Sequence, residues 1–312
     1  MLATTAIFLS RLRGSRRLTA EAVSSFFGIP ASAGWVVNLQ TEITSLLRPI
    51  YDELVAALPS LGWVNADESP YKECDLKSWL WAVRSEHFTV FALRPDRKDD
   101  QIQSLLGADF TGAVMCDRAK MYLGFKLIQW CWAHLRRDFI ELSETDPSIN
   151  NIGQELVDLT DELFHYWHLF RGGTLTRGGL QESMAELRER FEDALDRGAS
   201  SDYSLIAGRC RSILTRPEAL WAFVSTEGVE PTNNAAERAI RPLVILRRLT
   251  YGTQSADGSR FVETMHTILE TCLQQGRNVL EFVTDAITKA RLQEPLPSLL
   301  PDTECCLKVT TL

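Results

Sequence analysis

The sequence predicts a mixed α/β protein in which an all-helical segment interrupts the part of the chain that forms the sheet. Short apolar runs typical of strands cluster between residues 61 and 132. Residues 134–228 show helical periodicity without a convincing strand, and turn signals, a helix start and a further apolar stretch follow them. Apolar residues make up 45% and charged residues 24% of the 312 residues, which excludes a disordered, collagen-like or coiled-coil chain.

The first 58 residues are predicted to form a helical lead-in. Thr19 can cap a helix in which Val23, Phe26 and Phe27 follow at helical spacing. A break at 28–30 separates this helix from a second one over roughly 35–57. The pair has the outline of a helix–turn–helix DNA reader, although packing against a neighbouring core is the commoner use of such helices.

Strands are expected next, in the order three strands, a helix, a strand, a helix and a strand. Apolar runs place the strands at 63–67, 78–84, 88–93, 111–116 and 127–132, with a tight turn at 85–87 and a helix over 98–106. Helices are then predicted at 151–170 and 180–195, separated by a glycine-rich loop at 171–179. Residues 259–290 form either one long helix or two helices broken near Gly276.

These signals divide the chain into five parts. They are the lead-in (1–58), the first part of the core (59–138), a helical insertion (139–228), the second part of the core with C-terminal helices (229–291) and a loose, proline-containing tail (292–312).

Asp67 and Asp117 are each expected just past the end of an apolar strand, where sites are commonly built in α/β sheets. Two carboxylates there, joined by a third from a helix, would form an all-oxygen site that suits Mg²⁺ or Mn²⁺. Two such ions can activate a water and stabilise the leaving oxygen in phosphodiester cleavage. A single acid at a strand end is, however, more often simply solvated.

Glu237 is the candidate for the third acid, because it begins a predicted helix. Asn234 at the N-cap and Glu237 at N3 would also resemble a capping box, which requires no catalysis. The two interpretations are compatible, since a helix start can aim a carboxylate at a metal. Glu230 and Glu263 are the next acids to test if Glu237 proves wrong.

Several motifs add a family resemblance. Residues 65–69 (NADES), 114–117 (VMCD), 131–139 (CWAHLRRDF) and, above all, 230–244 (EPTNNAAERAIRPLV) resemble the transposases of the insertion-sequence family sixty-six. Residues 251–255, 258–263 and 272–278 continue the resemblance, which covers roughly 18–290. It implies a DDE transposase with an RNase H-like core and a helical insertion before the last acid.

The resemblance assigns Asp67, Asp117 and Glu237 as the catalytic acids and as ligands of two Mg²⁺ or Mn²⁺ ions. The implied activity is metal-dependent cleavage and strand transfer at insertion-sequence ends. The implied partners are double-stranded DNA (transposon ends and target), further copies of the chain in a homo-oligomer on DNA, and helper proteins of the same element.

Two departures from the family pattern leave these ligands in place. Ser69 stands where the family usually has Thr, and residues 118–122 (RAKMY) follow the second Asp where many members have a small or glycine-containing turn. Family members commonly carry a helical DNA-binding segment and a Cys-rich zinc module upstream. The extent of this chain therefore also fits a short variant, a fragment or a truncated relic.

Cys131 and His134 form a C-x₂-H pair that the family also shows. Two ligands do not make a structural zinc site, which needs four. We expect the pair to buttress the fifth strand near the acids, with a DNA or metal role for His134 as the alternative.

The net charge of −8 does not exclude a basic face that contacts DNA phosphates. Candidates cluster near the predicted acids, although surface ion pairs are their usual role. They are Arg118, Lys120, Arg136, Arg137, Arg238, Arg241, Arg247, Arg248 and Arg260. The tryptophans are mostly core candidates.

The chain is expected to be cytoplasmic, and nucleoid-associated when bound to DNA. No apolar run reaches the length of a membrane span, and the seven Cys contain no CxxC pair. Two alternatives to a transposase remain: a structure-selective nuclease on the same fold, and a truncated, non-catalytic DNA-binding relic.

Overall fold

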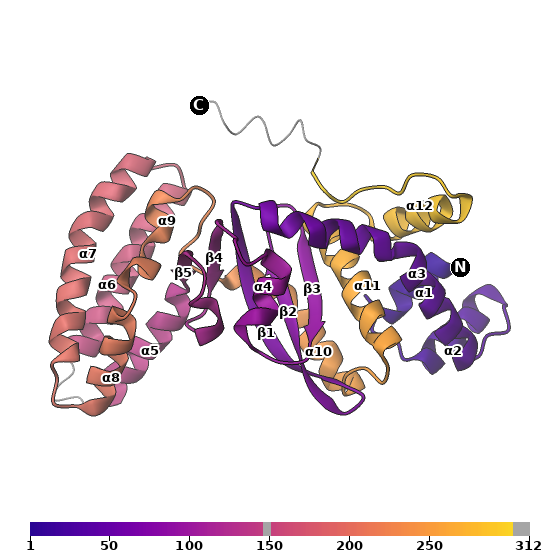
Figure 1. The fold of residues 1–312 in the computed structure, drawn as a ribbon, viewed down its shortest axis with the longest axis horizontal. Helices are drawn as coiled ribbons and strands as arrows, with labels where there is room; N and C mark the ends of the chain where they lie inside the picture. The colour runs from indigo at the N-terminus through magenta and orange to yellow at the C-terminus, as the bar shows by residue number, and fades with distance from the viewer. Residues whose placement is uncertain (146–150, 302–312) are drawn as a thin grey trace. The chain divides into compact units, whose positions relative to one another are not determined.

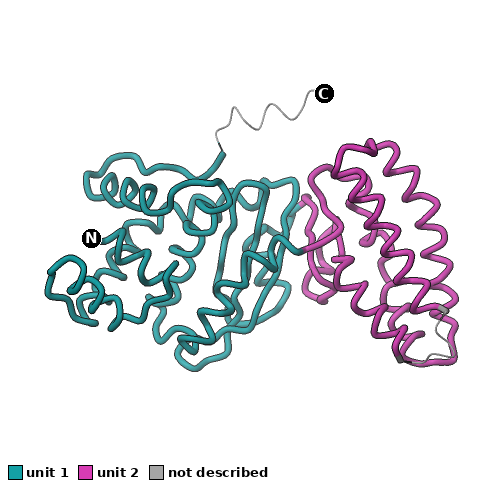
Figure 2. The backbone as a smooth tube through the Cα atoms, turned by 180° about the vertical axis from the view of Figure 1, so that it is seen from behind, with its two compact units in different colours: residues 1–110, 234–312 teal, residues 111–233 magenta. Residues whose placement is uncertain are grey.

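A computed structural model of the chain describes residues 1–145 and 151–301. The chain forms two compact units, one of residues 1–110 and 234–312 and the other of residues 111–233 (Figure 2). The described part contains five strands among a larger number of helices (Figure 1), which confirms the mixed α/β prediction. Three of the strands pair in antiparallel fashion and two in parallel fashion.

The first unit opens with three helices, α1 (Leu2–Leu9), α2 (Arg16–Phe27) and α3 (Ala33–Ala57), and a 3₁₀ turn, η1 (Leu58–Ser60). The predicted cap at Thr19 is wrong, because the Ser15 hydroxyl accepts the Leu18 N–H and α2 begins one turn earlier. Thr19 is buried inside the helix. Of the three predicted apolar positions only Val23 is buried, while Phe26 and Phe27 are exposed.

An antiparallel meander of β1 (Trp63–Glu73), β2 (Leu76–Arg84) and β3 (Thr89–Arg94) follows the helices. The prediction that the first strand ends at 67 is wrong, since β1 continues through Glu73. Its two-residue hairpin turn, Cys74–Asp75, has φ values of 48° and 64°, and positive φ at both positions is the requirement of a type I′ turn. A Cys-Asp pair is an unusual carrier of that turn, so the sequence does not signal it.

Helix α11 (Ala256–Gln274) covers the outer edge of β3 (Figure 1). The N–H groups of Thr89, Phe91 and Leu93 donate to side chains of α11 that are four residues apart. The acceptors are Thr271 Oγ1 at 3.1 Å, Thr267 Oγ1 at 2.9 Å and Glu263 Oε1 at 2.9 Å. Two residues of strand and four residues of helix advance by similar lengths, so one helix face satisfies alternate N–H groups of an edge strand.

We expect Thr267→Val to lower the free energy of unfolding by about 1–2 kcal/mol, because it leaves the buried Phe91 N–H without its acceptor while preserving side-chain shape. Urea unfolding monitored by circular dichroism measures the change. Thr284→Val is the control, since the Thr284 hydroxyl bonds only to Leu280 O on the exposed face of its helix. Equal effects of the two substitutions would contradict this role of Thr267.

The rest of the first unit consists of α4 (Asp99–Leu106), α10 (Asn234–Thr250) and α12 (Val279–Leu292). Gly276, with φ of 66°, separates α11 from α12, so the two-helix alternative is correct. The predicted loose tail is wrong for residues 293–300, because Leu299 is fully buried and its carbonyl accepts a hydrogen bond from Gln275 Nε2 at 2.7 Å. Residues 302–312 of that tail lie outside the described residues.

The second unit joins a parallel pair, β4 (Ala113–Cys116) and β5 (Leu127–Trp130), to a set of helices. The helix predicted between these strands is only a 3₁₀ turn, η2 (Lys120–Tyr122), and Trp132 opens a helix instead of ending β5. The remaining elements are α5 (Trp132–Thr145), α6 (Asn151–Arg171), α7 (Arg177–Ala199), α8 (Ser204–Leu214), η3 (Pro217–Leu220) and α9 (Ala222–Ser225).

No strand occurs in the described part of residues 134–228, as predicted. The glycine-rich loop is shorter than expected, because Thr176 caps α7 and two of the glycines lie in its first turn. Packed aromatic rings form the core of this unit: the Trp132 ring centroid lies 4.9 Å from that of Phe191 and 5.2 Å from that of Trp221.

Candidate functional site

Asp67 lies inside β1 rather than after it, and its side chain is half-buried. It stands directly opposite Ala82 of β2, so the two side chains share one face of the antiparallel sheet. Ala82 belongs to a buried apolar cluster with Leu80, Phe91 and residues of α10. Asp67 is therefore carried on the sheet face against which α10 packs.

Glu237 occupies the first turn of α10 and is half-buried. The helix begins at Asn234, so Asn233 precedes it and Glu237 is its fourth residue. The predicted capping-box positions are therefore wrong by one residue, because Asn234 is the first helical residue and Glu237 stands one place beyond N3. The next turn of α10 contributes Ala239 and Ile240 to the buried cluster on the sheet. Asp67 and Glu237 thus come from two elements of one unit that pack on each other.

Arg247, near the other end of α10, ties the helix to β1. Its guanidinium donates to Ser69 Oγ at 3.0 Å and to the Pro70 carbonyl. Burial, followed by the nearby charge of Arg248, lowers the pKa of Arg247 from its usual value. Arg247, a predicted DNA-binding residue, therefore forms hydrogen bonds within the protein, and the Ser69 hydroxyl is one of its acceptors.

Asp117 follows the last residue of β4, as the sequence predicts. Its Oδ1 accepts the Ala119 N–H at 2.8 Å, which closes a local turn and orients the half-buried carboxylate. Asp117 belongs to the second unit, whereas Asp67 and Glu237 belong to the first. Convergence of the three acids remains a prediction.

Cys131 joins three segments of the second unit at the end of β5. Its N–H donates to Cys116 O at 2.9 Å, and its buried Sγ accepts the Asn233 N–H at 3.3 Å. The His134 N–H in turn donates to Cys131 O at 3.0 Å. These contacts tie the C-x₂-H pair to the end of β5, and its role as a buttress of that strand stays a prediction.

Two of the four predicted basic residues of the second unit, Arg118 and Arg136, are engaged in ion pairs. Arg118 pairs with Asp138, which also pairs with Arg209 at 2.7 Å, and burial lowers the pKa of the Arg118 guanidinium. Arg136 forms a two-point contact with Asp161 at 2.6 and 2.9 Å, Arg137 donates to Ala133 O, and Lys120 is exposed.

Helix α10 presents a basic outer face. Arg238, Arg241 and Arg248 are exposed at spacings of three and seven residues, which places them on one side of the helix, opposite the buried Ala239 and Leu243. No ion pair with another described residue engages these three side chains. Arg260 on α11, by contrast, pairs with Asp257.

Glu263 and Glu230, the next acids to test after Glu237, both form ion pairs with arginines. Glu263 accepts from Arg48 at 3.1 Å and from the Leu93 N–H, and it lies 3.6 Å from Arg94. Glu230 pairs with Arg171. Arg16 and Arg17, which are not among the DNA-binding candidates predicted from the sequence, both line a pocket of the first unit.

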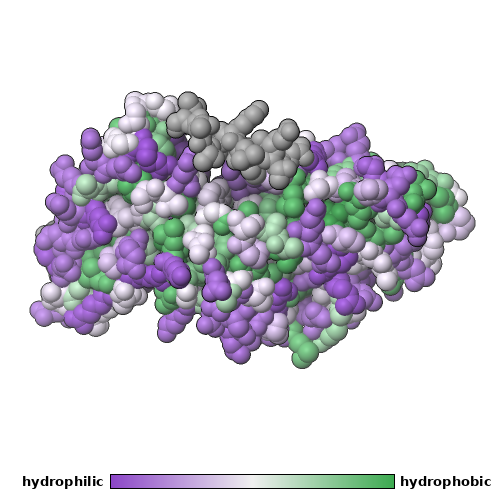
Figure 3. All heavy atoms as spheres, turned by 45° about the horizontal axis from the view of Figure 1, so that its top comes forward, coloured by the Kyte–Doolittle hydropathy of each residue, from purple (hydrophilic) through white to green (hydrophobic). Residues whose placement is uncertain are grey.

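Among the helices that the structure describes, none is long and apolar enough to cross a membrane. Hydrophilic and apolar residues are interspersed over the face that Figure 3 shows.

Comparison with known proteins places the chain in a family. The model of the family described as "Transposase IS66 family" matches residues 16–260. Two uncharacterized proteins of Sinorhizobium fredii (strain NBRC 101917 / NGR234) are similar to it. Protein y4qI is 29% identical over 305 residues, covering 86% of this chain and 55% of its own. Protein y4hP is 24% identical over 320 residues, and the match covers 86% of this chain and 56% of y4hP.

The chain therefore spans about half the length of these curated relatives. Because the family model matches most of its residues, the chain belongs to the IS66 family of transposases.

Proposed function

We propose that the protein is a DDE transposase that cleaves DNA and transfers the cut strand at the ends of an insertion sequence. The observation that carries this proposal is the packing of α10 on the sheet face that bears Asp67, because α10 also bears Glu237. Family membership supports the reaction class. The RNase H-like arrangement of 59–138 and 229–291 around a helical insertion belongs to the same proposal.

Asp67, Asp117 and Glu237 would hold two Mg²⁺ or Mn²⁺ ions. An all-carboxylate donor set fits these hard cations, and the half-burial of each acid leaves room for water and phosphate oxygens. When bound, such ions stabilise the charge on the attacking and leaving oxygens. The protein contributes positioning, as where the Ala119 N–H orients the Asp117 carboxylate.

The reaction has two phosphoryl transfers. In the first, water attacks a phosphodiester at the transposon end, and the P–O3′ bond breaks to free a 3′-hydroxyl. In the second, that 3′-hydroxyl attacks a phosphodiester of target DNA, and the displaced strand leaves with its own 3′-hydroxyl. Each step exchanges one P–O bond for another and needs no oxidant or reductant.

Double-stranded DNA is the proposed partner, and the outer face of α10 is its proposed contact. Arg238, Arg241 and Arg248 are exposed and share one side of the helix, and Arg238 directly follows Glu237. Arginines on one helix face that pair with no acid in the described part of the chain fit the phosphates of a duplex, and such contacts carry no sequence information. Assembly as a homo-oligomer on DNA and cooperation with helper proteins are further parts of the proposal.

We expect Arg241→Ala to weaken binding of all duplexes alike and to reduce the slope of log K against log salt by about 0.9, the value for one lost phosphate contact. Fluorescence anisotropy at several salt concentrations measures both quantities. The matched control is Arg188→Ala on α7, where Arg188 pairs with Glu192 in the same helix. An unchanged slope of log K against log salt for Arg241→Ala would show that Arg241 does not contact a DNA phosphate, which contradicts the proposed α10 contact.

The activity itself is tested with purified protein, Mg²⁺ and DNA that bears the element's own ends. Joined product supports the transposase. Nicking without joining supports the structure-selective nuclease, and absence of Mg²⁺-dependent nicking supports the non-catalytic relic.

A further inference from the structure

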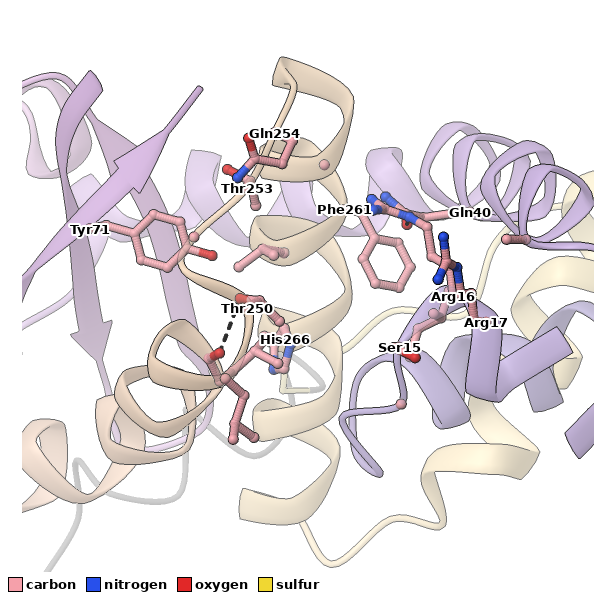
Figure 4. A pocket seen from close by; sticks show the side chains of 18 residues that line it. Ser15, Arg16, Arg17, Gln40, Tyr71, Thr250, Thr253, Gln254, Phe261 and His266 are labelled. Carbon is pink, nitrogen blue, oxygen red and sulfur yellow. Dashed lines mark hydrogen bonds between the residues drawn. The ribbon is translucent and has the colours of Figure 1, made fainter. Parts of the chain in front are cut away.

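A pocket of about 490 Å³ lies within the first unit (Figure 4), and none of Asp67, Asp117 and Glu237 lines it. The connection between α1 and α2, the end of β1, the C-terminal end of α10 and the first half of α11 form its walls. Figure 4 shows Tyr71 of β1 on one side, Arg16 and Arg17 on the other, and Phe261 and His266 of α11 between them.

Two polar side chains that line this pocket are buried. His266 is 4% exposed and Tyr71 is 2% exposed, and neither His266 Nε2 nor Tyr71 Oη has a hydrogen-bond partner among the described residues. Burial lowers the pKa of His266 to about 4, so the imidazole is neutral at physiological pH. A buried polar group without a partner costs about 1–3 kcal/mol, which a ligand that supplies hydrogen bonds would remove.

The charge of the pocket favours an anionic ligand. Arg16 and Arg17 line it, and none of its described lining residues is acidic. The N-terminal end of α2 opens on the same side, where Ser15 caps the helix. Free N–H groups at a helix start and two exposed guanidinium groups together suit a phosphate.

The wall next to Tyr71 is held in place by backbone contacts. The Thr253 N–H donates to Lys72 O at 3.0 Å, and the Cys74 N–H donates to Thr253 O at 2.8 Å. Gly252 has φ of 96°, and a Cβ there would lie 2.3 Å from Lys72 O, so only glycine permits this approach. The pocket is therefore a built feature of the unit rather than a gap between mobile loops.

The interior combines apolar walls with the two unpartnered groups. Leu246, Phe261 and Val262 line it beside the Tyr71 ring. A nucleotide has the matching chemistry, because its base offers a flat apolar face and a hydrogen-bonding edge while its phosphate carries the charge. Aromatic side chains are the usual partners of unstacked bases.

We propose that this pocket binds a single nucleotide, with its phosphate at Arg16 and Arg17 and its base beside Tyr71 and His266. The nucleotide is either free or the unpaired end of a DNA strand. The second source rests on the proposed function, since Arg248 of the basic α10 face lies one residue before Leu249, which lines the pocket.

Calorimetric titration with deoxyadenosine monophosphate, without Mg²⁺, tests the pocket independently of cleavage. We expect saturable binding that is tighter than that of inorganic phosphate. Tyr71→Phe should weaken it about fivefold, the worth of one neutral hydrogen bond, and joint Arg16→Ala and Arg17→Ala at least about tenfold. Tyr51→Phe, a buried tyrosine outside the pocket, and Arg291→Ala, an exposed arginine on α12, should leave it unchanged.

The source of the nucleotide is tested with a duplex that carries 2-aminopurine as a one-nucleotide overhang. A fluorescence change that is lost in Tyr71→Phe assigns the pocket to a DNA end, whereas nucleotide binding without that change assigns it to a free nucleotide. Absence of saturable nucleotide binding, or binding that neither pocket variant weakens, would overturn the proposal. Nucleotide binding by a protein that never nicks DNA would overturn only the proposed transposase activity.

Discussion

Replacing Asp117 by Asn is expected to reduce Mg²⁺-dependent strand cleavage by about a thousandfold or more, which corresponds to about 4 kcal/mol of lost transition-state stabilisation. The amide carries no charge and is a poor ligand for a hard cation. Folding should be unaffected, because the Asn side chain keeps an oxygen that can accept the Ala119 N–H. Nicking of end-bearing DNA under single-turnover conditions measures the loss.

The control for this substitution is Asp202→Asn, which changes an exposed acid in the same unit. Asp67→Asn and Glu237→Gln should reproduce the loss if the three acids act as one site. Retained cleavage in Glu237→Gln would show that Glu237 is not the third ligand. Retained cleavage in Asp117→Asn, with an intact circular dichroism spectrum, would contradict the DDE mechanism.

Glu263→Gln is expected to lower the free energy of unfolding by about 2–3 kcal/mol. Removing one partner from a buried ion pair costs about 3–5 kcal/mol, and we reduce this figure because Arg48 and Arg94 remain partly in contact with water. The Gln side chain can still accept the Leu93 N–H, so the loss measures the charge rather than the strand contact. Urea unfolding of the purified protein gives the free-energy difference.

Asp285→Asn is the matched control, because Asp285 forms an exposed pair with Lys289 one turn away on α12. Such pairs contribute well under about 1 kcal/mol. If Glu263→Gln is no more destabilising than this control, the arginine pair does not hold α3, β3 and α11 together. Loss of cleavage without loss of stability in Glu263→Gln would instead point to a catalytic role for this acid.

Local signals explain which predictions succeeded. The apolar runs at 78–84 and 88–93 lie on β2 and β3, and the turn between them is where it was expected. Gly276 divides the last helices, and Asp117 follows β4. In each case neighbouring residues carry the determining preference, so hydrophobic periodicity and glycine conformation suffice.

The errors arose where a more distant residue or an uncommon turn decides. β1 extends past Asp67 because β2 pairs with it up to Glu73. The turn between the two strands is Cys74–Asp75, and these residue types do not predict the positive φ that both adopt. Leu299 is buried in a segment whose carbonyl group accepts a hydrogen bond from Gln275 Nε2, 24 residues earlier in the chain. Periodicity within a short window contains no information about either partner.

The sequence by itself determined the family, the class of fold and the identity of the candidate acids, because motifs and helix and strand periods are local properties of the chain. Only the tertiary structure decided what those residues contact. Asp67 lies on the sheet face that α10 covers. Arg247 and Glu263 are engaged in contacts within the protein, with Ser69 and Arg48. Arg16, Tyr71 and His266 come together to line one pocket. The physical reason is sequence separation: Thr267 and Phe91 are 176 residues apart, and only folding of the whole unit brings such pairs within hydrogen-bonding distance.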